Sequence, residues 1–153
     1  MKKIIAILAV LVCLLFIVSC KDKGIEYTAV EGGYIVSGYS GDREEIKIPS
    51  KHEGESVIGI GEKAFYGIEG IREVSLPESI TYIGAEAFYG CFDLESINLP
   101  KSVERVETGA FDGCSFINFD RVGGCNYIDG WLISLYDKDQ TTIDVRDGTI
   151  GIY

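Results

Sequence analysis

Apolar and polar residues follow the same order three times in the middle of the chain. Two or three apolar positions mark a short extended segment, a proline follows, two more apolar positions come next, and an Ala-Phe pair and a glycine end the unit. Segments 46–67, 71–91 and 94–114 share this order, and the Ala-Phe pair recurs every 23 residues. One such unit cannot bury its apolar face alone, so the pattern predicts stacked coils with a continuous core.

The second segment shows how one coil is expected to fold. Val74 and Leu76 predict a short strand, and Pro77 ends it because proline has no N–H for a ladder. Ala87-Phe88 is expected to pack inward from a short helical or irregular stretch. Gly90 is expected to release the chain into the next coil with a positive φ.

Aromatic and sulfur side chains recur at the same coil position. Phe65, Phe88 and Phe111 are predicted to stack as a ladder inside the core. Cys91 and Cys114 are also 23 residues apart. They are interpreted either as two buried thiols or as a disulfide between neighbouring coils, which an oxidising compartment would allow.

The first unit carries an insertion. Pro49 lies eight residues before Val57, whereas the matching distance in the other units is three. The additional residues fall within 51–56, which are polar and contain glycine, so a surface loop is predicted. His52 lies in this loop and is expected to be solvated.

The repeat resembles the leucine-rich repeats of the Bacteroides surface protein A type, also called the Treponema pallidum type. The resemblance rests on 94–103, LESINLPKSV, and 80–91, ITYIGAEAFYGC. It implies a leucine-rich-repeat solenoid, α/β or mainly β, built as a short right-handed coil stack over residues 46–115. Glu107 and Asp112 depart from the pattern of the earlier units and make the turn of the third coil less certain.

The two ends of the repeat block have their own patterns. Residues 27–45 read as a β-hairpin with a Gly-Gly turn, and the resemblance implies that this hairpin caps the first coil. Residues 116–153 are predicted to form an irregular hairpin turning at Asp129-Gly130, followed by the start of a further repeat. A fragment of a longer repeat adhesin is therefore one alternative.

The first residues form an export signal. Lys2 and Lys3 precede an apolar run over 4–18, which is shorter than the roughly 20 residues of a membrane-spanning helix. The residues Ile17-Val18-Ser19-Cys20 resemble the bacterial lipobox. The resemblance implies cleavage of residues 1–19, acylation of Cys20, and a short tether over 20–26.

Two alternatives to lipidation remain, an ordinary secretory signal and an uncleaved anchor. With lipidation, the predicted location is a membrane-anchored envelope lipoprotein, at the outer membrane or the cell surface. Residues Lys21-Asp22-Lys23 could act in sorting. The sequence leaves the membrane face open.

Charge narrows the range of partners. The chain has 14 Lys+Arg and 24 Asp+Glu, and removal of Lys2 and Lys3 would leave a net charge of about −12. Such an acidic chain is a poor partner for nucleic acid. The expected partners are proteins or glycans of host or neighbouring cells, with membrane contact through the lipid.

Catalytic and metal-binding patterns are missing from the sequence. It contains no G-x-S-x-G, H-E-x-x-H or Walker motif and a single histidine, His52. Asp137-Lys138-Asp139 is only a weak calcium signal. We therefore expect a protein that is not an enzyme, with no cofactor and no metal.

Binding residues are expected on one face of the strands and on outward aromatic side chains. Polar residues predicted to line the strand face are Arg72, Glu73, Ser75, Glu95, Ser96 and Asn98. Tyr66, Tyr89 and Trp131 are the aromatic candidates for protein or glycan contact. For Trp131 the alternative interpretation is a plug at the C-terminal end of the core.

Overall fold

The computed structural model describes residues 24–118, 121–122, 125–129, 131–135 and 151–152. The predicted signal peptide, Cys20 and Asp137-Lys138-Asp139 lie outside these residues, as does most of the predicted further repeat. Within the described ranges, no helix is long and apolar enough to cross a membrane.

The chain begins with an antiparallel hairpin. Strands β1 (Ile25–Val30) and β2 (Gly33–Tyr39) pair along their length. Gly32 and Gly33 form the turn with φ values of 90° and 150°, which favour glycine over residues with a Cβ. The hairpin predicted from the sequence is confirmed.

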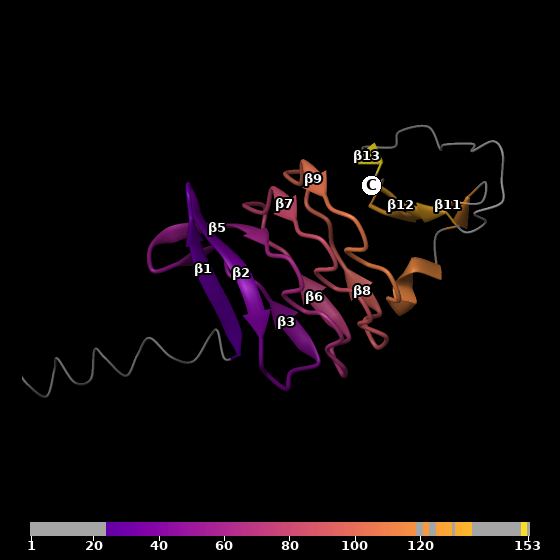
Figure 1. The fold of residues 1–153 in the computed structure, drawn as a ribbon, viewed down its shortest axis with the longest axis horizontal. Coiled ribbons are helices and arrows are strands. Elements are labelled where there is room, and N and C mark those ends of the chain that lie inside the picture. Colours follow the sequence, from indigo (N-terminus) through magenta and orange to yellow (C-terminus); the bar gives the residue numbers. More distant parts are fainter. Residues whose placement is uncertain (1–23, 119–120, 123–124, 130, 136–150, 153) are drawn as a thin grey trace, which may run out of the picture.

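The coils that follow contribute strands to two sheets (Figure 1). Sheet B contains the parallel strands β3 (Glu45–Lys47), β6 (Glu73–Ser75) and β8 (Ser96–Ile97). Sheet A continues from β2 through β5 (Glu55–Ile60), β7 (Tyr82–Ile83) and β9 (Arg105–Val106), all parallel. Each coil therefore crosses from one sheet to the other and back.

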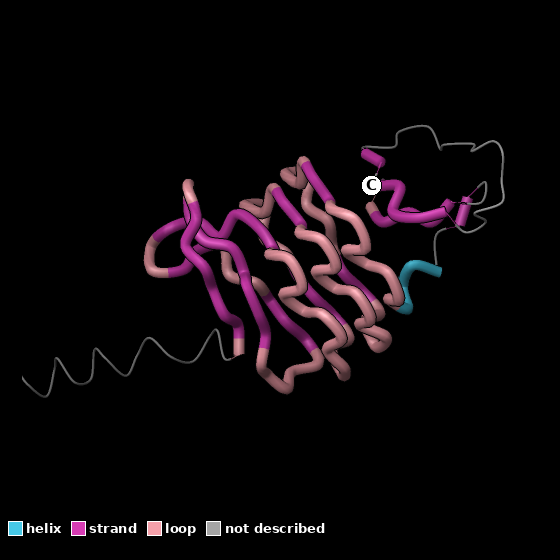
Figure 2. The backbone as a smooth tube through the Cα atoms, in the orientation of Figure 1, coloured by secondary structure: helices cyan, strands magenta, loops and turns pink. Residues whose placement is uncertain are grey.

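Most of each coil lies outside the strands. Figure 2 shows long loops between short strands, and the one described helix is the 3-10 turn η1 (Ser115–Asn118). The loops remain in register because the Phe65 N–H donates to Ala87 O and the Phe88 N–H to Ala110 O, both at 2.7 Å. The fold is a mainly β leucine-rich-repeat solenoid, and the Ala-Phe stretches are turns.

An aromatic column runs through the core. Phe65, Phe88 and Phe111 are fully buried and stack with centroid separations of 4.9 and 5.5 Å and interplanar angles of 6°. Tyr39 lies 5.6 Å from Phe65 at one end, and Phe116 lies 5.9 Å from Phe111 at the other. The predicted ladder of three rings is confirmed and is closed at both ends by a further ring.

Polar side chains also connect neighbouring coils. The hydroxyls of Ser79 and Ser102, in the Pro-x-Ser segments, donate to Val57 O and Ile80 O at 2.7 Å. The third coil keeps the turn of the first two, since the Ala110 N–H donates to Glu107 O at 3.3 Å as its counterparts do. Glu107 therefore does not disrupt this turn.

The cysteines of neighbouring coils are buried free thiols. The Cys91 Sγ donates to Phe65 O at 3.0 Å, and the Cys114 Sγ donates to Phe88 O at 3.1 Å. Of the two interpretations of this pair, the structure contains the thiols and not the disulfide.

The insertion in the first coil is a second hairpin. Strand β4 (Lys51–His52) pairs with the start of β5, and Glu53 and Gly54 form the turn with φ values of 49° and 89°. His52 is half-buried between two tyrosine rings, so the expectation of a solvated histidine is wrong. Its ring lies 3.9 Å from the Tyr27 ring, because the hairpin folds onto the N-terminal cap.

The C-terminal segment forms a separate small sheet. It contains β10 (Arg121–Val122), β11 (Cys125–Ile128), β12 (Trp131–Leu135) and β13 (Gly151–Ile152). Strands β11 and β12 are antiparallel and join at Asp129, which has a φ of 45°. The irregular hairpin predicted here is present.

Candidate functional site

The outer face of sheet B carries the polar strand residues predicted from the sequence. Glu73 and Ser75 lie on β6 and Ser96 lies on β8, while the intervening Val74 and Ile97 are buried. Arg72, Glu95 and Asn98 flank these two strands. The structure therefore brings the six residues together on one surface, which we call the strand face.

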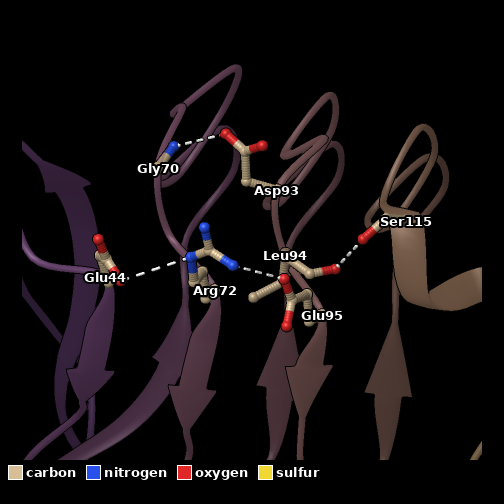
Figure 3. Close-up of polar contacts among 7 residues, drawn as sticks. All are labelled: Glu44, Gly70, Arg72, Asp93, Leu94, Glu95 and Ser115. Carbon is tan, nitrogen blue, oxygen red and sulfur yellow. Dashed lines mark hydrogen bonds and ion pairs between the residues drawn. The ribbon is translucent and has the colours of Figure 1, made fainter.

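A ladder of alternating charges crosses the strand face (Figure 3). The Arg72 guanidinium lies 3.4 Å from the Glu44 carboxylate and 2.8 Å from the Glu95 carboxylate. All three side chains are mostly exposed, so each pair stabilises the fold by only about 0–1 kcal/mol. These charges therefore remain available for exchange with charges of a partner.

Asn98 differs from its neighbours on the strand face. Its amide donates to Leu76 O at 2.9 Å and accepts from the Leu76 N–H at 2.7 Å. One coil further on, Asp129 accepts from the Leu99 N–H at 2.7 Å. The Asn98 side chain thus holds two coils together, and its role in binding a ligand stays a prediction.

A shallow hollow of about 730 Å³ follows β3 on the side of the first coil. It is lined by β3, its flanking residues and the outer face of β6: Arg43, Glu45, Ile46, Lys47, Ile48, Pro49, Ser50, Glu73, Ser75 and Pro77. The lining mixes both charges with apolar atoms. The repeat pattern did not predict this hollow, because the pattern describes positions within one coil. The hollow is formed by residues of two neighbouring coils.

Three exposed aromatic side chains lie on the turns that lead from sheet A to sheet B. Tyr66 and Tyr89 are 48% and 41% exposed, and their rings stack with centroids 5.1 Å apart and an interplanar angle of 9°. Phe92 is 68% exposed. We call Tyr66, Tyr89 and Phe92 the aromatic ridge.

The sequence pattern indicated the two tyrosines but not Phe92. The tyrosines directly follow the core phenylalanines of their coils, whereas Phe92 matches Glu69 and Ser115 of the other coils. A Cβ on Gly113 would lie 3.4 Å from the Phe92 ring, which shows that the ring lies beside the glycine of the next coil. Only the stacking of coils reveals this position.

Trp131 does not belong to an exposed binding surface. It is 6% exposed and packs with the core, as the plug interpretation expects. Tyr82 is also partly covered, because the Arg105 guanidinium lies 4.7 Å from its ring centroid. Among the side chains that the structure describes, the exposed aromatic ones are therefore those of the aromatic ridge.

A third cluster joins the cap to the inserted hairpin. The His52 ring stacks on Tyr27 and meets Tyr34 edge-on at 4.8 Å, while the Tyr34 hydroxyl donates to the Glu53 carboxylate at 3.0 Å. The bond to Glu53, with smaller contributions from desolvation and nearby carboxylates, raises the pKa of Tyr34. The contacts of this cluster join the inserted hairpin to the N-terminal cap.

The described residues contain no group of three metal-ligating side chains that could hold an ion. The two buried thiols are poor nucleophiles, since burial raises the pKa of Cys91 to about 11 and that of Cys114 further. What the described surface offers is polar and aromatic contact area.

Comparisons with known proteins agree with this geometry. The family model for the BspA type leucine rich repeat region matches residues 39–134 with six copies. No curated protein sequence matches the chain significantly.

Solved structures share the fold. A leucine-rich repeat protein from T. pallidum is 34% identical with a TM-score of 0.58, over 60% of this chain and 44% of that chain. A leucine rich cell surface protein from Faecalibacterium prausnitzii is 25% identical with a TM-score of 0.56, over 63% of this chain and 28% of that chain. The chain thus spans less than half of either protein.

A leucine-rich repeat protein from Bacteroides capillosus, 22% identical with a TM-score of 0.50, shares the fold over 63% of this chain and 91% of that chain. The family model covers more than half of the sequence, and its range contains every coil. The chain belongs to the BspA-type leucine-rich repeat family.

Proposed function

We propose that this protein is an exported lipoprotein, anchored through Cys20, that binds a partner protein on host or neighbouring cells without catalysing a reaction. The lipobox and the short tether over 20–26 would hold the solenoid near the membrane. The similarity to a leucine rich cell surface protein supports a surface location. The observation that carries the binding role is the aromatic ridge.

The ridge has the properties of a protein-binding surface. Tyrosine buries a large area on contact and loses little conformational entropy, so tyrosines carry much of the binding free energy at many interfaces. Phenylalanine is also enriched at interfaces. Tyr66 and Tyr89 already hold each other in place, because their rings stack at 5.1 Å. Lys63, whose ammonium lies 6.0 Å from the Tyr66 ring centroid, adds a charge at the edge of the ridge.

A cell-binding assay tests this function. Bacteria displaying the full chain are expected to adhere to immobilised matrix proteins or to a second bacterial species, and Tyr89→Ala and Phe92→Ala should each reduce adhesion about tenfold. Glu104→Ala is the matched control, since Glu104 is exposed and lies away from the ridge. Adhesion that survives both ridge substitutions would refute a role for the ridge.

A glycan is the second candidate ligand, favoured by the large exposure of Phe92, which could offer a ring face to a sugar. The stacked tyrosines favour protein, because each uses one ring face on the other. Treatment of the target cells separates the two. Protease should abolish adhesion to a protein partner and leave glycan binding intact, whereas periodate oxidation should do the reverse.

Lipidation is tested independently of binding. Metabolic labelling with a fatty acid should mark the wild-type chain and not the Cys20→Ser variant, which should also leave the membrane fraction. A chain that remains in the membrane without label would indicate an uncleaved anchor. Extracellular protease then distinguishes the cell surface from the inner side of the envelope.

A further inference from the structure

The two sheets of the solenoid end differently at the N-terminal side. In sheet A the first coil strand, β5, is covered by β2 and then β1. In sheet B the described strands end at β3, which pairs only with β6. Figure 1 shows β3 as the first strand of its sheet. The hollow described above lies over the outer side of β3 and of its neighbour β6.

The hydrogen bonds of β3 show which backbone groups point to the open side. The Arg72 and Glu73 N–H groups donate to Glu44 O, and the Ile48 N–H donates to Ser75 O. Successive residues of a strand direct their N–H and C=O groups to opposite sides. Residues 44, 46 and 48 therefore bond to β6, while the backbone groups of Glu45 and Lys47 point away from it.

The side chains along this edge carry opposite charges in a symmetric order. Glu45 and Lys47 are exposed, Ile46 between them is buried, and neither charge has an ion pair within the described part of the chain. Pro49 lies two residues beyond Lys47 and has no N–H to donate. The open edge therefore ends after a three-residue segment, Glu-Ile-Lys.

We propose that β3 is a dimerisation strand that pairs in antiparallel fashion with β3 of a second copy of this chain. A two-fold axis at Ile46 places Glu45 opposite Lys47 of the second copy, and Lys47 opposite its Glu45. Each of these two pairs exchanges two backbone hydrogen bonds, because the groups of residues 45 and 47 face outward. Each pair also gains a cross-strand ion pair.

The order of charges favours a second copy over an unrelated strand. Glu-Ile-Lys is its own complement when read in the opposite direction, as a two-fold interface requires. Parallel pairing of the same segment would set like charges side by side, which is unfavourable. Charged residues on a short edge can also prevent association, so that a monomer is the alternative that an experiment must exclude.

A dimer has a consequence for the binding function. It joins two solenoids edge to edge through β3, and each copy brings its own aromatic ridge. Two linked sites bind a multivalent surface with an avidity well above that of one site. The dimer itself does not depend on that function, since its contacts lie on β3 alone.

Sedimentation velocity of the full chain in detergent micelles tests the dimer over a range of protein concentrations. Wild type should shift from monomer to dimer, and Glu45→Lys or Lys47→Glu should each raise the dissociation constant at least about tenfold by opposing like charges. The double variant Glu45→Lys/Lys47→Glu should dimerise like wild type. The two single variants, mixed, should form a heterodimer. Glu104→Lys controls for net charge.

Each single variant is expected to keep the fold, because both positions are exposed on β3. A loss of the dimer can then be assigned to the interface. A lysine at position 45 would lie beside Glu73, its register partner on β6, and circular dichroism should match wild type. Wild type that stays monomeric overturns the proposal, and so does a dimer that neither single variant weakens.

Cross-linking reports the register. A carbodiimide joins a carboxylate to an ammonium only when the two groups touch. In a mixture of ¹⁴N- and ¹⁵N-labelled chains, a mixed-isotope peptide linking Glu45 to Lys47 is expected. Cross-links that involve other residues, with none at Glu45, would show association through another surface and would reject this interface.

Discussion

The side-chain amide of Asn98 forms the two hydrogen bonds with the backbone of Leu76 that a neighbouring strand would otherwise form. It accepts from the Leu76 N–H at 2.7 Å and donates to the Leu76 C=O at 2.9 Å. Strand β8 ends at Ile97, so its main chain does not reach this position. Asparagine is suited to the task because it offers a donor and an acceptor on one planar group.

Replacement of Asn98 should therefore destabilise the solenoid. Asn98→Ala leaves two partly buried backbone groups of Leu76 without these partners, and we expect the free energy of unfolding to fall by roughly 1–3 kcal/mol. Urea unfolding followed by circular dichroism measures this change. Ser96→Ala, on the same coil but with its exposed side chain pointing outward, is the control and should change stability by less than about 0.5 kcal/mol. Equal effects of the two would contradict the assignment.

The central ring of the aromatic column should be the most sensitive core position. Phe88→Ala removes a buried ring that stacks on both Phe65 and Phe111, and large-to-small changes of this kind destabilise proteins by about 3–5 kcal/mol. Tyr89→Ala, the next residue, removes an exposed ring and should cost much less. Urea unfolding of both variants compares them directly, and a loss for Tyr89→Ala as large as that for Phe88→Ala would exclude a dominant role of the column.

The 23-residue period predicts the buried residues that recur from coil to coil. Buried positions recur with the coil, so Phe65, Phe88 and Phe111 could be aligned without a structure. The period could not predict what lies beside each residue on the neighbouring coil. Asn98 looked like a surface residue because its partner, Leu76, is 22 positions away.

Features outside the period were the hardest to predict. His52 occurs once, in a segment that the other coils lack, and its stacking partners belong to the cap. The open edge of β3 could not be predicted from the repeat either, because the repeat does not show which strand of a sheet lacks a neighbour. Lys63, Glu86 and Gly109 share a positive φ at one coil position, and only the third residue, a glycine, carries a sequence signal for it.

The His52 cluster should fasten the inserted hairpin to the cap. His52→Ala removes a stacked contact with Tyr27 and an edge contact with Tyr34, each worth about 0.5–1.5 kcal/mol. We expect faster amide hydrogen exchange in β1 and β2, with little change in β7 and β9. His52→Phe should restore protection, while Lys51→Ala should behave as wild type. Uniform acceleration along the solenoid would show that the cluster supports the whole fold instead of the cap.

The buried thiols should make stability depend on pH in the alkaline range. Burial raises the pKa of Cys91 from its ordinary value of 9.0 to about 11, and it raises that of Cys114 as well. Below pH 9 both the folded and the unfolded chain keep these protons, so the contribution of the thiols is fully present. Between pH 9 and 11 the unfolded chain releases these protons more readily than the folded chain does. The free energy of unfolding should therefore fall by roughly 2 kcal/mol from Cys91 alone, and Cys114 should add a loss of its own. Tyrosines and lysines titrate in the same range, so the measurement is the difference between wild type and Cys91→Ala/Cys114→Ala in urea unfolding at each pH. The wild type should lose more stability than the double variant as the pH rises, and parallel pH profiles would show that the thiols are not buried as the structure has them.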